Sequence, residues 1–127
     1  MPLRATFVTT TAVVLAGMAW AAPARAAAPT TDFEVCGQRG CVAQRAEGTI
    51  TWGPRGSIVG TAIDRGPGGT KVVLTISTPS GRVTEPILVD EGRKPFSITV
   101  ANPTSVTVSV CTAPITTFPC VSETYTP

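Results

Sequence analysis

From about residue 47 onward, apolar and polar side chains alternate in short runs that glycine and proline separate. The clearest run spans residues 70–78, in which every second residue is apolar: Val72, Leu74 and Ile76. A period of two places successive side chains on opposite faces of a β-strand. The alternation therefore predicts strands with one buried face and one solvated face.

Turn-forming residues cut the chain at intervals of about ten residues, which is typical of a sandwich or barrel. Expected strands cover residues 47–52, 57–64, 70–78, 83–89, 96–101 and 106–110, and residues 32–36 and 121–126 are candidates for a first and a last strand. Helical spacing of apolar residues is absent from the exported part of the sequence. We predict an all-β fold, an immunoglobulin- or fibronectin-like antiparallel β-sandwich of about seven strands, with a small barrel as the alternative.

The apolar positions of these strands make up the expected core. Trp52 needs a hydrogen-bond partner for its indole N–H if it is deeply buried. The full expected core is Ile50, Trp52, Val72, Leu74, Ile76, Ile87, Val89, Phe96, Ile98, Val100, Val106, Val108 and Val110.

The first 26 residues have the pattern of a secretory signal peptide. Arg4 precedes an apolar stretch, and Ala24 and Ala26 fit a small-residue cleavage site. The apolar stretch also approaches the length of a membrane anchor, which is the alternative reading. We predict a signal peptide over 1–26, an N-terminal segment over 27–46 with the first strand and a cysteine loop, and a body over 47–127. These last two parts form one secreted, extracellular domain, without a membrane anchor after cleavage.

Removal of the signal peptide leaves a neutral chain. The whole sequence has ten Lys and Arg against eight Asp and Glu, and Arg4 and Arg25 lie within the first 26 residues. A neutral domain without a basic stripe lacks the electrostatic attraction that drives binding to nucleic acid. Nucleic acid is therefore excluded as a partner.

Four cysteines, Cys36, Cys41, Cys111 and Cys120, lie in the exported part. An even number in an oxidising compartment predicts two disulfides, and zinc is disfavoured by the spacings and by the absence of histidine. Three pairings are possible. We favour Cys36 with Cys41 and Cys111 with Cys120, because each pair closes a short loop rich in turn residues.

The residues give little support to catalysis. Without histidine there is no Ser-His-Asp triad, and disulfide-bonded cysteines cannot act as nucleophiles. A glycosidase-like pair of carboxylates remains, from Asp64, Glu85, Asp90 and Glu91, but each is expected to be a solvated charge beside a turn. We therefore expect no enzymatic activity, no cofactor and no metal site.

The segment between the last two cysteines is the sharpest candidate for binding. A Cys111–Cys120 bridge would close it, and two prolines would stiffen it, so that little entropy is lost on docking. It resembles the disulfide-closed reactive loops of Bowman-Birk-type serine-protease inhibitors, which also open with Cys-Thr and contain proline. The candidate binding residues are Thr112, Pro114, Ile115, Thr116, Thr117, Phe118 and Pro119.

Threonines are frequent at strand positions that we expect to be polar: Thr70, Thr75, Thr99 and Thr107. Threonine is a good β-former, which by itself explains the pattern. A hydroxyl-rich face can also bind glycans.

The strand phrases around Gly48–Gly53 and Ser105–Cys111 resemble those of small secreted β-sandwich proteins of actinobacteria. This resemblance implies export and a sandwich fold, and it lends no activity. We therefore expect a secreted, monomeric, non-enzymatic binding or structural module that recognises an extracellular protein or cell-wall polysaccharide. The alternatives are an extracellular serine-protease inhibitor that uses the Cys111–Cys120 loop and a small secreted glycoside hydrolase.

Overall fold

A computed structural model describes residues 27–113 and 119–127 of the chain. The predicted signal peptide lies outside the described residues. Within the described ranges, no helix has the length and apolar character needed to cross a bilayer.

The described residues form eight β-strands and no helix, which confirms the all-β prediction. The count exceeds the expected seven because both terminal segments form strands that pair with a neighbour. The strands are β1 (Thr30–Cys36), β2 (Gln44–Thr51), β3 (Gly56–Asp64), β4 (Gly69–Thr78), β5 (Gly81–Val89), β6 (Gly92–Val100), β7 (Ser105–Ala113) and β8 (Val121–Tyr125).

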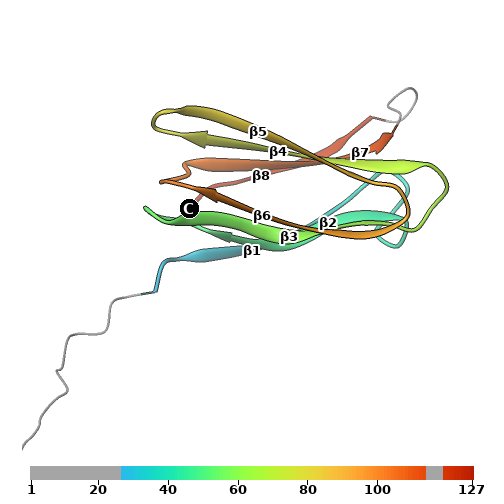
Figure 1. The fold of residues 1–127 in the computed structure, drawn as a ribbon, viewed down its shortest axis with the longest axis horizontal. Coiled ribbons are helices and arrows are strands. Elements are labelled where there is room, and N and C mark those ends of the chain that lie inside the picture. The colour runs from blue at the N-terminus through green and yellow to red at the C-terminus, as the bar shows by residue number, and fades with distance from the viewer. Residues whose placement is uncertain (1–26, 114–118) are drawn as a thin grey trace, which may run out of the picture.

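Two four-stranded antiparallel sheets face each other in a sandwich (Figure 1). The first sheet has the order β1-β2-β3-β6, and the second has the order β5-β4-β7-β8. The chain runs through β1, β2 and β3 in sequence, crosses to β4 and β5, returns with β6, and ends in the second sheet. Every neighbouring pair is antiparallel.

Strand β2 begins at Gln44, three residues before the expected start at Glu47. Its early residues pair with both neighbours, since Ala46 lies opposite Val35 of β1 and Ala62 of β3. Ala46 and Gln44 are both fully buried, so the alternation of buried and outward-facing residues along β2 begins at Gln44. The boundary between the N-terminal segment and the body consequently falls inside a strand.

The core lies between the sheets and contains every residue predicted for it, with Ile98 and Val100 partly buried. The apolar faces of both sheets close on it because the strands alternate as the sequence pattern predicts. Trp52 is 2% exposed, and its indole N–H donates to Thr31 Oγ1 at 2.9 Å, which supplies the partner that burial demands.

A row of four residues across the first sheet shows why this core needs glycine. Phe33, Gly48, Gly60 and Phe96 lie side by side on β1, β2, β3 and β6. A Cβ at Gly48 would lie 3.0 Å from the Phe33 ring and closer still to the β3 backbone, and one at Gly60 would lie 2.9 Å from the Phe96 ring. The two glycines therefore leave the space into which both rings pack.

At the edge of the sandwich where β1 and β8 are the outermost strands, Phe33 contacts Tyr125, with ring centroids 6.0 Å apart. Burial raises the pKa of the Tyr125 phenol, and the neighbouring negative charge of Glu123 raises it further. This contact links β1 of the first sheet to β8 of the second.

Candidate functional site

Both disulfides form as favoured from the sequence, Cys36–Cys41 and Cys111–Cys120. Strand register places them at the same end of the sandwich. In the first sheet Cys36 is next to the start of β2, whose Gln44 pairs with Asp64, and Asp64 pairs with Gly92. We call this the disulfide end.

The second sheet ends in the same way. Thr70 pairs with Val89 of β5 and with Thr112 of β7, and Val110 pairs with the first residue of β8. All four odd-numbered strands therefore end at the disulfide end (Figure 1). The even-numbered strands, β8 included, end at the opposite end, where β1 begins.

Four polar side chains are buried in one layer at the disulfide end: Gln44, Asp64, Thr70 and Thr112. We call them the polar cluster. Each occupies the inner-face position of its strand that is nearest this end, where the apolar alternation of the core stops. Gln44 and Asp64 belong to the first sheet, and Thr70 and Thr112 belong to the second.

Hydrogen bonds connect the polar cluster across the two sheets. Gln44 Nε2 donates to Thr70 Oγ1 at 3.1 Å and to Thr112 Oγ1 at 3.2 Å. Thr70 Oγ1 in turn donates to Asp64 Oδ1 at 2.9 Å. A buried polar group is costly unless it is paired, and a satisfied network holds its members in one arrangement.

The same cluster holds the loops. Asp64 Oδ2 accepts a hydrogen bond from the backbone N–H of Glu91 at 2.9 Å, and Glu91 has a φ of 81°, a left-handed conformation that is uncommon for a residue other than glycine. The Arg39 N–H donates to Gln44 Oε1 at 3.4 Å. The Arg39 guanidinium donates to the carbonyl of Pro67. Three connections are thereby tied to one another or to the cluster.

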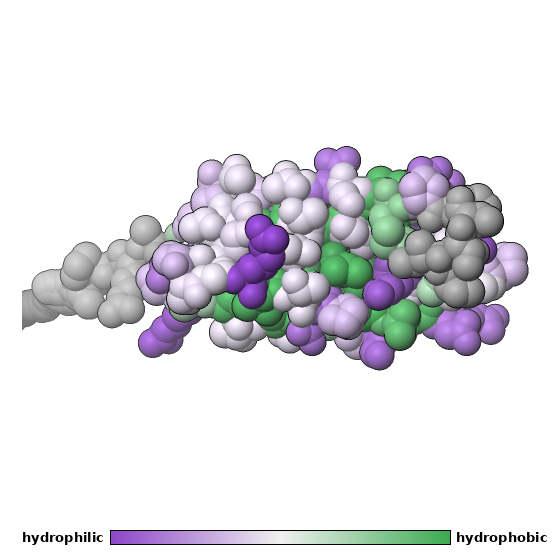
Figure 2. Space-filling model, turned by 90° about the horizontal axis from the view of Figure 1, so that it is seen from above, coloured by the Kyte–Doolittle hydropathy of each residue, from purple (hydrophilic) through white to green (hydrophobic). Residues whose placement is uncertain are grey.

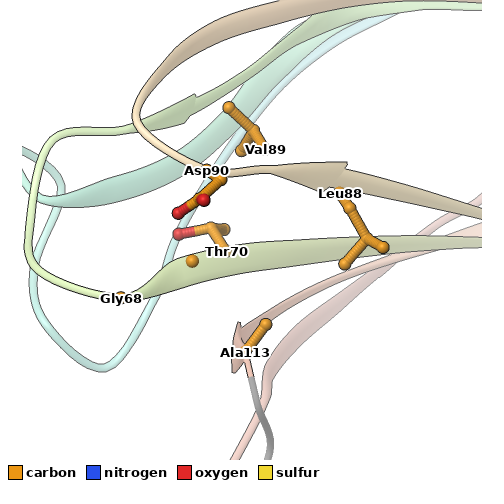
Figure 3. A pocket seen from close by; sticks show the side chains of 7 residues that line it. Gly68, Thr70, Leu88, Val89, Asp90 and Ala113 are labelled. Atoms are coloured by element: carbon orange, nitrogen blue, oxygen red, sulfur yellow. The ribbon is translucent and has the colours of Figure 1, made fainter.

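A hollow of about 540 Å³ opens beside the polar cluster. Figure 3 shows Leu88 of β5 and Ala113 of β7 near the start of β4, where Gly68 lies. The glycines have no side chains to fill the space between the neighbouring strands. We call this hollow the groove, and its lining is Gly68, Gly69, Thr70, Leu88, Val89, Asp90 and Ala113.

Exposed apolar side chains are also concentrated here. Among large hydrophobic residues that the structure describes, Val42 and Leu88 are the most exposed, at 78% and 59%. Val42 follows the Cys36–Cys41 loop, and Leu88 lines the groove. Exposed apolar groups beside an open hollow are a feature of binding surfaces.

Two of the candidate binding residues are among those that the structure describes, Thr112 and Pro119. Thr112 is 6% exposed and belongs to the polar cluster, where its hydroxyl accepts a hydrogen bond from Gln44 and does not face a partner. Pro119 is exposed. Pro114, Ile115, Thr116, Thr117 and Phe118 lie outside the described residues, so their predicted role stays a prediction.

Two expectations about polar residues were wrong. Asp64 is fully buried at the end of β3 instead of solvated in a turn, because it shares the inner face with Ala62. Thr70 is fully buried as well, because it shares the inner face of β4 with Val72. Extending the period of two by one step at each strand end would have found both, and would have found Gln44.

The other acidic candidates are exposed: Glu85, Asp90 and Glu91. Within residues 27–113 and 119–127, no three His, Cys, Asp or Glu side chains gather in a way that could hold a metal ion. Comparisons with protein-family profiles, curated proteins and solved structures gave no match.

Proposed function

We propose that the protein is an exported, non-enzymatic binding module that contacts an extracellular protein partner through its disulfide end. The observation that carries this proposal is that several features of a binding surface lie at one end of the sandwich: both disulfides, the groove and the exposed apolar side chains of Val42 and Leu88. Loops that are held before binding lose little entropy when a partner docks.

The strand order supports this choice of end. Without β1, the sheets read β2-β3-β6 and β5-β4-β7-β8. This corresponds to strands A-B-E and C′-C-F-G of an immunoglobulin-like sandwich. In variable immunoglobulin domains, the B–C and F–G loops at one end bind antigen. Their counterparts here follow β3 and β7, and both of these strands end at the disulfide end.

The acidic residues offer poor support for a hydrolase. Asp64 is fully buried and uses both carboxylate oxygens inside the protein, so it does not reach a substrate. Glu85 lies within β5, and Asp90 directly follows the end of that strand, five residues later. Five extended residues span about 17 Å, which exceeds the separation of about 5 to 9.5 Å between the carboxylates of a glycosidase.

Export is tested by collecting the protein from the medium of cells that express the full sequence. We expect N-terminal sequencing to begin at Ala27, because Ala24 and Ala26 precede the bond. Recovery only from the membrane fraction, with residues 1–26 retained, would instead support an anchor.

Binding is tested with a photo-crosslinking residue placed singly at four exposed apolar positions. Val42 and Leu88 lie at the disulfide end, whereas Val59 and Val83 are exposed elsewhere, at 48% and 38%. In cultures that secrete the protein, we expect the same discrete adduct from positions 42 and 88 and none from 59 and 83. Equal adducts at all four positions, or none at any, would contradict the proposal.

A second candidate is supported by the Cys111–Cys120 bridge, which closes the loop that resembles a serine-protease inhibitor. The test is titration of trypsin, chymotrypsin and elastase with the purified protein. Stoichiometric inhibition that Cys111→Ser with Cys120→Ser abolishes would favour this candidate. Full protease activity at a molar excess of the protein would dismiss it.

A further inference from the structure

The outer face of the second sheet has a regular arrangement of hydroxyl groups that the proposed function leaves unused. Register places four threonines in one row across all four strands: Thr84 of β5, Thr75 of β4, Thr107 of β7 and Thr124 of β8. Neighbouring strands are about 4.8 Å apart, so this row extends about 14 Å.

The rows on either side continue the pattern. Ser109 and Ser122 are neighbours in the next row toward the disulfide end, and Ser77 and Ser105 are neighbours in the row toward the opposite end. We call these three rows the hydroxyl face, formed by Thr75, Ser77, Thr84, Ser105, Thr107, Ser109, Ser122 and Thr124. Figure 2 views the molecule from this side, and side chains of intermediate hydropathy cover much of the half nearer the β4–β5 hairpin.

Hydrogen bonds between strands orient some of these hydroxyls in advance. The Thr107 and Thr124 Oγ1 atoms are 2.9 Å apart, and the Ser109 and Ser122 Oγ atoms are 2.7 Å apart. A hydroxyl has one donor and two acceptor sites, so each pair retains capacity for a ligand. The side chains on β4 and β7 are partly exposed, and those on β5 and β8 are exposed.

Charge on this face is sparse and of one sign. Among the outward-facing described residues of β4, β5, β7 and β8, the charged side chains are Lys71 and Arg82, which lie outside the central threonine row. The first sheet differs, since its outer face has Asp32, Glu34, Arg45 and Glu47, with Arg45 paired to the two glutamates. The hydroxyl face therefore offers hydrogen bonds with little electrostatic attraction.

From these observations we infer that the hydroxyl face binds an extended, neutral polysaccharide. Hydroxyls that both donate and accept match a polyol ligand, which does the same. The equal spacing of the rows suits a repeating polymer better than a single small molecule. A protein partner fits less well, because the buried core of a protein interface is mostly apolar, and hydroxyl side chains hold most positions of these three rows.

Exposed hydroxyls compete with water, so each contact contributes little and many contacts are needed. Insoluble chitin and cellulose therefore serve as probes, with polygalacturonate as an anionic comparison. We expect retention on at least one neutral polymer, unchanged by high salt. Retention on none of the neutral polymers, or retention on polygalacturonate alone that salt abolishes, overturns the inference.

The deciding variant is Thr75→Val with Thr107→Val, which removes two hydroxyls from the middle of the threonine row and keeps β-branched side chains. We expect the retained fraction to fall about tenfold. The matched control is Thr51→Val with Thr99→Val, the same changes on the outer face of the first sheet. We expect wild-type retention from this control.

Circular dichroism and the thermal midpoint establish that both variants fold. If the threonine double variant does not fold, Ser109→Ala with Ser122→Ala replaces it with the same expected loss. Wild-type retention by the folded variant, or an equal loss in the control, overturns the inference. Val42 lies on the β1–β2 connection and not on the second sheet, so the crosslinking result at position 42 does not depend on this face and each proposal fails separately.

Discussion

The interior of the sandwich is apolar at one end and polar at the other. At the end away from the disulfides, the core is apolar as far as Trp52, and the indole N–H of Trp52 donates one hydrogen bond, to Thr31. Its β4–β5 turn consists of Pro79 and Ser80 alone. At the disulfide end the last core layer is polar, two bridges close the loops, and a groove opens.

The difference indicates that the polar layer at the disulfide end positions loops rather than adding stability. A well-packed apolar layer is often as stabilising as a buried polar one, so apolar residues at all four positions could hold the sheets together as well. The polar cluster in addition holds loop backbone in place, because Asp64 accepts a hydrogen bond from Glu91 N–H and Gln44 accepts one from Arg39 N–H. The end with the more elaborate interior is the end whose loops are held in place.

The contrast between the ends is tested most severely at Asp64. Asp64→Ala leaves the Thr70 hydroxyl and the Glu91 N–H without their acceptor, and we expect a loss of about 3 kcal/mol in the free energy of unfolding. Denaturant unfolding measures it. Asp64→Asn, which keeps one acceptor, should lose about half as much. An unchanged stability in Asp64→Ala would show that the cluster is dispensable.

Opening the longer bridge is expected to have the next largest effect. Cys111→Ser with Cys120→Ser removes a loop closure of about ten residues, worth about 2 to 3 kcal/mol. The measurement is the urea midpoint. Cys36→Ser with Cys41→Ser is the comparison, with a smaller loss expected because the closed loop is shorter. A larger loss for the shorter bridge would contradict this ranking.

A single hydrogen bond at the opposite end should matter less. Thr31→Val preserves the shape of the side chain and removes the acceptor of the Trp52 indole N–H, so we expect a loss of about 1 kcal/mol. Trp52 fluorescence during denaturation reports it directly. Thr30→Val, one residue earlier on the exposed face of β1, is the control and should be neutral.

The smallest expected effect is confined to alkaline solution. Because burial and Glu123 raise the pKa of Tyr125, the folded state holds this proton more tightly than the unfolded state does. Its contribution is complete below the ordinary tyrosine pKa of about 10 and is lost as the pH rises beyond it. Tyr125→Phe should remove that part of the pH dependence between pH 9 and 11. An identical slope in both proteins would disprove the linkage.

Local signals in the sequence predicted most of the fold. A period of two with Gly and Pro turns is visible within ten residues, so the central strands and the core followed from it. The disulfide pairs followed from short spacings between turn residues. Local patterns could not predict the pairing of β3 with β6, because paired residues such as Ile58 and Ile98 are far apart in the chain.

The candidate site was harder to predict for a related reason. Asp64 and Thr70 flank a glycine-rich turn, and local composition alone assigns such residues to solvent. Only the pairing of Gln44 with Asp64 and of Thr70 with Thr112 brings the four polar side chains into one buried layer. A polar residue that continues an apolar alternation is thus ambiguous until its neighbours in the other strands are known.

The position of Thr30 and Tyr125 has a practical consequence. Both residues lie at the end of the sandwich away from the disulfides, at the outer limits of β1 and β8. A bead, dye or second protein attached after Tyr125 would stand about one strand length from the groove. Arrays immobilised in this way would present every copy with its loops pointing into the solution.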